Sequence, residues 1–305
     1  MVKELKIIFA GLDFGGKTTI IKALKQKQYA FEGLKPTKGI ERFSIDVLDC
    51  CFTEWDLGGQ DIYRKQYLEN KMPFYSTDLL YYVIDIADSN RFSEVLEYYK
   101  NIIEIFNTQN LNPPIIMLLN KNDIKEDIQE DVVQNLQNSL LNISKDFKIE
   151  FFRTSIYEPQ TLMHAFSHGI NKISKQTSEL SAQLKDMAAE TFSDAILLIE
   201  GNGFILGDYS KDEQSRKMGM IVYDNLIGAF SLMYKTLQKS EKPERIIIDW
   251  EDEGNAFLDS TEIDNFEFFY IRYTSNPRKV VQKFVLRSLI QSSKQIKDII
   301  KNYFG

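Results

Sequence analysis

The residues from Gly11 to Thr19, with the sequence GLDFGGKTT, are those whose types and spacing most clearly suit a chemical task. They fit the pattern G-x-x-x-x-G-K-[ST], with Gly11, Gly16, Lys17 and Thr18 at its fixed positions. Glycines let the backbone curl so that successive N–H groups point inward, and a following helix adds its positive end. Lys17 can then reach the terminal phosphates while the Thr18 hydroxyl holds Mg²⁺. The pattern predicts a site for a nucleoside triphosphate, to which Asp13, Phe14, Gly15 and Thr19 also contribute.

A second motif, WDLGGQ, occupies residues 55–60 and ends an apolar, strand-like run. The carboxylate of Asp56 is of a type that holds Mg²⁺, usually through a water. Gly59 lets its backbone N–H approach the γ-phosphate more closely than a side chain would allow. Gln60 carries an amide that can orient an attacking water. The motif therefore predicts hydrolysis of the triphosphate by positioning and electrostatics.

A third motif, NKND, follows another apolar run and contains Asn120, Lys121 and Asp123. The Asp123 carboxylate can accept hydrogen bonds from N1–H and from the 2-amino group of guanine. Adenine has neither donor there and would leave the carboxylate unpaired. Asn120 and Lys121 are expected to brace the base and the phosphate loop. The motif predicts guanine recognition and argues against an ATPase or a kinase.

A fourth segment, RTSI at residues 153–156, follows the last strand-like run of this region. The backbone N–H of Ile156 could donate to the guanine O6, and Ser155 would steady that turn. This pattern is weak alone, and it gains weight from following the other motifs in order.

Strand-like and helix-like segments alternate from residue 1 to residue 175. The alternation predicts an α/β P-loop fold, a mostly parallel six-stranded sheet with helices on both faces. In such sheets ligands bind beyond the carboxyl ends of the strands, where each motif lies. The expected strands are Leu5–Ala10, Glu41–Leu48, Cys50–Trp55, Leu79–Asp85, Ile115–Leu119 and Ile149–Phe152, and the expected helices are Thr18–Lys27, Phe92–Phe106, Glu130–Ser144 and Gln160–Ile173.

These motifs together resemble the Ras-like superfamily of small GTPases over about the first 175 residues. GLDFGGKTT, KPTKG at residues 35–39 and WDLGGQ resemble the Arf family. LYYVID at 80–85, the pair Tyr98-Tyr99 and RTSIYE at 153–158 are more similar to the Rag (Gtr) family. Asp13 departs from many Ras-like proteins, which have glycine there, although Arf-type loops also carry it.

The resemblance implies a GTP-binding switch that uses Mg²⁺ and slowly hydrolyses GTP to GDP. It also implies an activating partner that stimulates hydrolysis and an exchange partner. It implies that Thr37 contacts Mg²⁺ and the γ-phosphate, and we expect it to act in catalysis with Lys17 and Gln60. Loss of the γ-phosphate would release residues 30–42 and 57–73. An alternative remains open, a nucleotide-loaded scaffold with little or no GTP turnover.

Residues 176–305 follow a different pattern, with the order helix, two strands, helix, three strands, helix. The turn EGNGF at 200–204 joins the first two strands as a hairpin. The order resembles the roadblock fold, an α+β domain that Rag-type GTPases carry, and it implies a homodimer or a heterodimer with a related GTPase. Four apolar residues on the middle helix could face either the domain's own sheet or a partner, and we favour the core for them: Ile221, Leu226, Phe230 and Met233.

The composition limits the other possibilities. A length of 305 residues suits two domains, and the net charge of −7 argues against a nucleic-acid partner. No apolar stretch reaches the roughly 18 residues that cross a bilayer, and we identify no signal peptide or lipidation site. We therefore expect a cytoplasmic protein without a membrane anchor of its own, recruited to membranes only through partners.

Two further pairs of residues carry no predicted chemistry. Cys50 and Cys51 are neighbours on an expected strand and point to opposite faces, so a mutual disulfide is not expected. His164 and His168 have a spacing found among zinc ligands, but the local sequence places no carboxylate with them. We interpret them as surface or packing residues.

Overall fold

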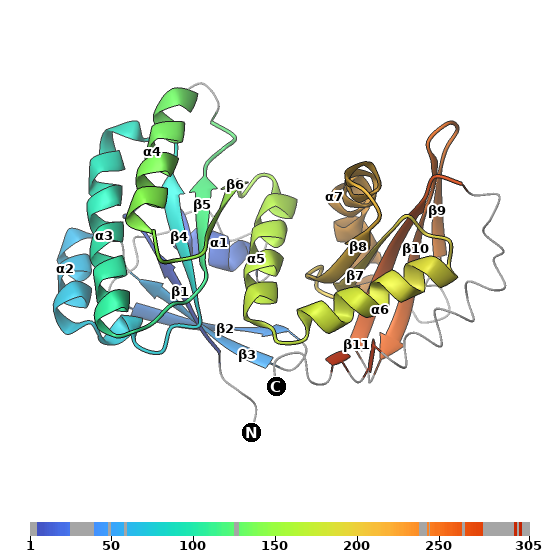
Figure 1. Cartoon of the computed structure of the whole chain (residues 1–305), viewed down its shortest axis with the longest axis horizontal. Coiled ribbons are helices and arrows are strands. Elements are labelled where there is room, and N and C mark those ends of the chain that lie inside the picture. The colour runs from blue at the N-terminus through green and yellow to red at the C-terminus, as the bar shows by residue number, and fades with distance from the viewer. Residues whose placement is uncertain are drawn as a thin grey trace. The chain divides into compact units, whose positions relative to one another are not determined.

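The computed structural model describes residues 5–24, 40–47, 50–57, 60–124, 128–237, 243, 245–263, 266–276, 296–297 and 299–300. The chain divides into two compact units, Met1–Ile173 and Ser174–Gly305 (Figure 1). The division falls two residues before the boundary between residues 175 and 176 that the sequence suggested.

The first unit is built on one sheet with the strand order β2-β3-β1-β4-β5-β6. Its six strands are β1 (Leu5–Ala10), β2 (Ile40–Val47), β3 (Cys50–Leu57), β4 (Leu79–Asp85), β5 (Ile115–Asn120) and β6 (Ile149–Thr154). β2 pairs antiparallel with β3, and the other neighbouring strands are parallel. Parallel strands are covered on both faces, which explains the almost continuous apolar sequences of β4 and β5. The predicted α/β fold with a mostly parallel sheet is confirmed.

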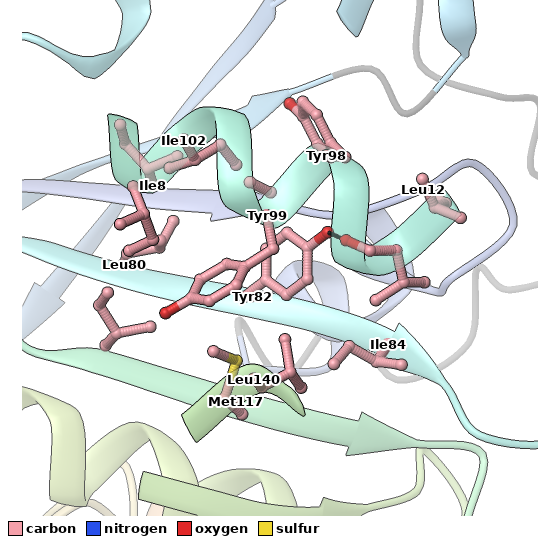
Figure 2. Close-up of a cluster of buried hydrophobic side chains, with 14 of the residues drawn as sticks. Ile8, Leu12, Leu80, Tyr82, Ile84, Tyr98, Tyr99, Ile102, Met117 and Leu140 are labelled. Atoms are coloured by element: carbon pink, nitrogen blue, oxygen red, sulfur yellow. Dashed lines mark hydrogen bonds between the residues drawn. The ribbon is translucent and has the colours of Figure 1, made fainter. Parts of the chain in front are cut away.

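Helices lie on both faces of this sheet, with α1 and α5 on one face and α2, α3 and α4 on the other (Figure 1). Successive side chains of β4 point to opposite faces of the sheet and contact helices on both. Tyr82 points toward α3, where its hydroxyl donates to the Val95 carbonyl at 2.7 Å (Figure 2). Tyr81 points the other way and donates to the Phe166 carbonyl of α5 at 2.8 Å. The helices are α1 (Lys17–Leu24), α2 (Asp61–Asn70), α3 (Phe92–Thr108), α4 (Glu130–Ile143) and α5 (Pro159–Ile173), with the 3₁₀ turns η1 (Met72–Phe74) and η2 (Ser89–Arg91).

Gly169 of α5 lies directly against the buried Tyr81. A Cβ added to this glycine would stand 2.3 Å from the tyrosine hydroxyl. The Tyr81 ring stacks between Phe9 of β1 and Phe166, at centroid distances of 4.8 and 5.6 Å. A side chain at position 169 would therefore disturb the contact between α5 and the sheet.

Helix α2 was not among the helices expected from sequence, which treated residues 57–73 as one switch segment. Its sequence, DIYRKQYLEN, is mostly polar and has no broad apolar stripe. Two of its side chains, Arg64 and Tyr67, are nevertheless buried against the domain. Tertiary contacts therefore stabilise a helix that the apolar periodicity of its own sequence does not predict.

The second unit is an antiparallel sheet with the order β8-β7-β11-β10-β9, accompanied by helices. Its elements follow the predicted order as far as the last strand, and the predicted closing helix lies almost wholly outside the described residues. The bounds are α6 (Thr177–Glu190), β7 (Ala195–Glu200), β8 (Ile205–Ser210), α7 (Glu213–Thr236), β9 (Arg245–Trp250), β10 (Gly254–Ile263) and β11 (Phe266–Thr274).

Helices α6 and α7 pack on opposite faces of this sheet. A Cβ on Gly207 of β8 would meet Leu180 of α6 at 2.9 Å, and one on Gly219 of α7 would meet Leu197 of β7 at 2.7 Å. Gly207 pairs with Leu198, whose side chain points away from that of its neighbour Leu197. The sheet is therefore covered on both sides.

The buried stripe of α7 differs from the predicted one. Ile221 is 38% exposed, so its predicted place in the core is wrong. Leu226 and Met233 are half-buried, and the side chain of Phe230 lies outside the described residues. The buried side chains of this helix are instead Met218, Val222, Tyr223 and Ile227, so the buried stripe passes through Val222, the residue next to Ile221.

A buried cluster of charges links the last three strands. Asp259 of β10 accepts hydrogen bonds from Nε and Nη2 of Arg272 on β11, at 3.0 and 2.7 Å, and from Nε of Arg245 on β9. Asp259 and Arg272 are 4% and 0% exposed. Burial lowers the pKa of Arg272, although its contact with Asp259 acts in the opposite direction. One carboxylate thus compensates two guanidinium groups.

Candidate functional site

The phosphate loop joins β1 to α1 and bends sharply at two glycines. Gly11 and Gly16 have φ angles of +141° and +96°, which side chains rarely adopt. A Cβ on Gly11 would come within 2.2 Å of the Val83 carbonyl oxygen. One on Gly16 would come within 2.5 Å of Nδ2 of Asn120. Both positions of the motif therefore require glycine for the loop to keep this shape.

Lys17 begins α1 and turns its side chain back over the loop. Its Nζ donates to the carbonyl oxygens of Gly11 at 3.1 Å and of Leu12 at 2.7 Å. The residue is only 6% exposed, so the ammonium group is held against the start of the loop. Thr18 and Thr19 follow in the first turn of the helix, where backbone N–H groups lack intrahelical partners. This end of α1 has the charge and the donors that phosphates require.

The carboxylate of Asp13 binds Arg91, the last residue of η2, which immediately precedes α3. Nη2 of Arg91 lies 2.6 Å from Oδ1 of Asp13, and Nη1 donates to the Asp13 carbonyl at 3.1 Å. Burial alone would lower the pKa of Arg91, but its hydrogen bonds to Glu94 and Asp13 raise it overall. The negative charge of Asp13 is therefore neutralised within the protein. Sequence reasoning missed Arg91, which lies 78 residues from Asp13.

Phe14 occupies the tip of the loop in a left-handed conformation, with φ of 59°, and is 69% exposed. Beside it lies a pocket of about 280 Å³. The walls come from the loop, the end of β4, η2, α3 and the turn after β5; they are Leu12, Asp13, Phe14, Gly15, Val83, Asp85, Asp88, Arg91, Val95 and Lys121.

Asn120, at the end of β5, connects three loops of the candidate site. Its Nδ2 donates to the Gly15 carbonyl at 2.9 Å, and its Oδ1 accepts from the Thr154 hydroxyl at 3.2 Å. Asn120 is 2% exposed and Thr154 is fully buried. The carboxyl ends of β1, β5 and β6 thus meet at this amide.

The two charged residues of the NKND motif have partners on neighbouring strand ends. Lys121, with φ of 65°, binds Asp85 at the end of β4 through a 2.5 Å ion pair. Asp123 accepts a hydrogen bond from the hydroxyl of Ser155, which is itself fully buried. Ile156 follows in the turn that Ser155 stabilises. Asp85 was not predicted as a site residue, although it ends an expected strand at the same edge of the sheet.

The WDLGGQ motif is only partly described. Gln60 is the N-cap of α2, and its carbonyl accepts from the backbone N–H of Tyr63 and Arg64, both at 3.0 Å. Asp56 pairs with Phe9 of β1, near the start of the phosphate loop. The Asp56 side chain lies outside the described residues, as do Gly59 and Thr37. Their roles remain predictions.

Residues 1–177 match the ADP-ribosylation factor (Arf) family, and this match covers more than half of the 305 residues. The chain belongs to the Arf family. The match ends four residues beyond the first unit, so the family resemblance expected from the phosphate loop is confirmed for that unit. The Arf family is a family of small GTPases.

Two individual proteins are similar to this Arf-family chain. Ras-related GTP-binding protein B of Rattus norvegicus is 26% identical over 190 residues, which are 61% of this chain and 50% of that protein. This chain thus spans half the length of that curated relative. A solved structure of the Arl6 BBS3 small GTPase of Trypanosoma brucei with the bound nucleotide analogue GppNp is 20% identical and gives a TM-score of 0.47. The match covers 56% of this chain and 98% of the Arl6 chain.

The donors of the Arf-family chain that could hold Mg²⁺ are hard oxygens. Thr18 lies in the first turn of α1, and Asp56 lies on the strand beside β1. The part of the chain that the structure describes contains no group of three or more carboxylate, histidine or cysteine side chains suited to a metal. A magnesium ion would therefore depend on the Thr18 hydroxyl, the Asp56 carboxylate and phosphate oxygens, which fits its preference for oxygen ligands.

Two remaining observations concern predictions made outside the motifs. Nε2 of His168 lies 2.6 Å from Oε2 of Glu150 on β6, a carboxylate that the local sequence could not reveal. Lys172 binds the other oxygen of Glu150 at 2.6 Å. Among the described residues, no helix has the length and apolar character needed to cross a membrane.

Proposed function

We propose that this chain is a Mg²⁺-dependent GTP-binding switch that hydrolyses GTP slowly and changes its switch segments between the GTP and GDP states. The observation that supports this most directly is the contact of Asn120 with Gly15 and Thr154. It joins the loop suited to phosphates with the loops suited to guanine. Such a rigid arrangement favours one ligand that spans all three loops, a guanine nucleotide.

The residues divide the work as follows. The N–H groups of the loop and the Lys17 ammonium bind the phosphates, and Asp123 accepts two hydrogen bonds from guanine. Mg²⁺, when bound by Thr18, Thr37 and Asp56, neutralises phosphate charge. Gln60 orients a water whose oxygen bonds to the γ-phosphorus as the bond to the β–γ bridging oxygen breaks. The products are GDP and inorganic phosphate.

Hydrolysis is slow because, among the arginines whose side chains the structure describes, none beside the phosphate loop is free to stabilise the charge that develops on the phosphates. Arg91 lies beside the loop, but Asp13 and Glu94 hold its guanidinium group. Ras-like domains without such an arginine turn over at roughly 10⁻⁴–10⁻³ s⁻¹. An activating protein therefore supplies the missing charge, and an exchange protein releases GDP.

The base preference is tested by the nucleotide that copurifies with the chain and by Asp123→Asn. This substitution should weaken GTP binding and favour xanthosine triphosphate, since it exchanges an acceptor for a donor. Asp131→Asn, on the exposed side of α4, makes the same change in charge and should leave binding unchanged. Copurified ATP would contradict the proposal.

Phosphate release separates a switch from a nucleotide-loaded scaffold. A switch requires multiple turnover, with the wild type faster than Gln60→Leu. If both proteins are equally inert, with and without candidate partners, the chain is a scaffold.

We also propose that residues 176–305 form a roadblock-like domain that pairs with a second copy or with a related GTPase. The order of elements and the antiparallel sheet support this reading. Strand β9 ends the sheet and carries three consecutive isoleucines, of which Ile247 is 47% exposed. An apolar edge strand of this kind readily pairs with another chain.

Sedimentation of the full chain tests the pairing. The wild type should sediment at twice its chain mass, alone or with a related GTPase, and Ile247→Lys should reduce the dimer fraction. Leu141→Lys on α4 is the control, because its residue is 49% exposed but lies in the other unit. A monomeric wild type under both conditions would contradict dimerisation.

A further inference from the structure

A network of side chains with alternating charges runs from the phosphate loop to helix α2. It starts with the Asp13–Arg91 ion pair described above. Nε of Arg91 then donates to Oε2 of Glu94 at 2.9 Å, and the other oxygen of Glu94 accepts from Nη2 of Arg64. Among the described residues of this network, Glu94, in the first turn of α3, contacts both arginines.

Arg64 depends on Glu94 because its charge is buried. The residue is 5% exposed, and its guanidinium lies 5.4 Å from the ring centroid of Tyr98. Its other carboxylate contact, Asp61, is longer at 3.5 Å and largely exposed. Nη1 of Arg64 is buried and has no hydrogen-bond partner in the part of the chain that is described. A buried guanidinium that loses its main counter-charge becomes unfavourable, and the helix carrying it must then move.

The position of Arg64 is tied to that of Gln60. The backbone N–H of Arg64 donates to the Gln60 carbonyl at 3.0 Å. Gln60 is the N-cap of α2, so this hydrogen bond closes the first turn of the helix. Fixing the Arg64 side chain against α3 therefore fixes the first turn of α2 and the residue at its N-cap.

We propose that Glu94 is a positioning residue for GTP hydrolysis, holding Gln60 through Arg64. This inference rests on the proposed function, because it concerns the rate of the same reaction. Glu94 is not one of the residues proposed to contact the nucleotide or the attacking water. Its loss should therefore reduce the rate of hydrolysis while changing nucleotide affinity little.

The test is single-turnover phosphate release from full-length chain loaded with GTP and Mg²⁺. Glu94→Gln should lower the rate of phosphate release about tenfold, since catalysis by positioning is sensitive to shifts of about an ångström. The affinity for a fluorescent GDP analogue should stay within about threefold. Glu97→Gln, three residues further on the exposed side of α3, removes the same charge and should leave the rate unchanged.

A double-variant cycle shows whether Glu94 acts through Gln60. If it does, Glu94→Gln combined with Gln60→Leu should be no slower than Gln60→Leu alone. Multiplying effects, or a wild-type rate in Glu94→Gln, would overturn the inference. Should Glu94→Gln fail to fold by circular dichroism, Arg64→Lys takes its place, because it keeps the charge but loses the second hydrogen-bonding arm.

The same assay distinguishes the two proposals. A wild-type chain that releases no phosphate above a protein-free blank overturns the proposed hydrolysis together with this inference. A wild type that releases phosphate at the same rate as Glu94→Gln overturns only the role of Glu94.

Discussion

Replacing Asn120 with alanine should weaken guanine-nucleotide binding strongly, although the side chain need not touch the nucleotide. The amide makes two buried hydrogen bonds, one to the Gly15 carbonyl and one from the Thr154 hydroxyl. Each such bond contributes about 0.5–1.5 kcal/mol, so the pair contributes about 1–3 kcal/mol. In the nucleotide-free variant the loops can relax and expose these groups to water, whereas in the bound state they cannot. The loss therefore appears in the dissociation constant, which should rise about 5- to 150-fold.

Titration with a fluorescent GDP analogue in excess Mg²⁺ measures this change. Asn122→Ala is the matched control, because its amide lies in the same turn but contacts only the exposed Arg153. Its dissociation constant should stay within about twofold of wild type, since exposed contacts contribute little. If Asn120→Ala binds as tightly as Asn122→Ala, the connection between the loops does not organise the site.

Four further predictions concern stability, each measured as a free energy of unfolding in urea. Gly169→Ala should destabilise the first unit by about 1–3 kcal/mol, because the added methyl meets the tyrosine hydroxyl packed there. Gly228→Ala on α7, with nothing within 4 Å, should instead stabilise the second unit by about 0.5–1 kcal/mol. Asp259→Asn should cost about 3–5 kcal/mol by leaving two guanidinium groups uncompensated, whereas the exposed Asp249→Asn should change little; equal effects would refute this. Burial would raise the pKa of Glu94, but hydrogen bonds from two arginines lower it below the usual 4.5. Its stabilising effect is therefore present above pH 4.5 and lost as pH falls below it, so Glu94→Gln should lose less stability than wild type on acidification.

The sequence predicted those parts of the molecule whose physics is local. The phosphate loop was predictable because Gly11 and Gly16 must adopt left-handed backbone angles at a fixed spacing. β4 and β5 were predictable because strands covered on both faces need continuous apolar side chains. The meeting of Asn120 with the phosphate loop followed from the rule that ligand-binding residues gather at strand ends.

The parts that were missed depend on contacts between distant residues. Helix α2 is stabilised by the ion pair of Arg64 with α3, which no periodicity of its own sequence reveals. Arg91 reaches Asp13 across 78 residues, and neither residue indicates its partner. The exposed Ile221 shows a further limit, because a shift of one position along a helix turns a side chain by 100°.

The pocket beside Phe14 offers a way to act on this chain with small molecules. Its volume of about 280 Å³ is near the lower end of the range for small-molecule sites. Its described walls include the Asp13–Arg91 ion pair but no residue of α1, whose first turn would bind the triphosphate. Four of these wall residues, Asp13, Phe14, Gly15 and Lys121, are ones expected to bind the nucleotide, so a fragment bound there would compete with it. Fragment screening by crystal soaking or NMR should therefore begin on nucleotide-free protein.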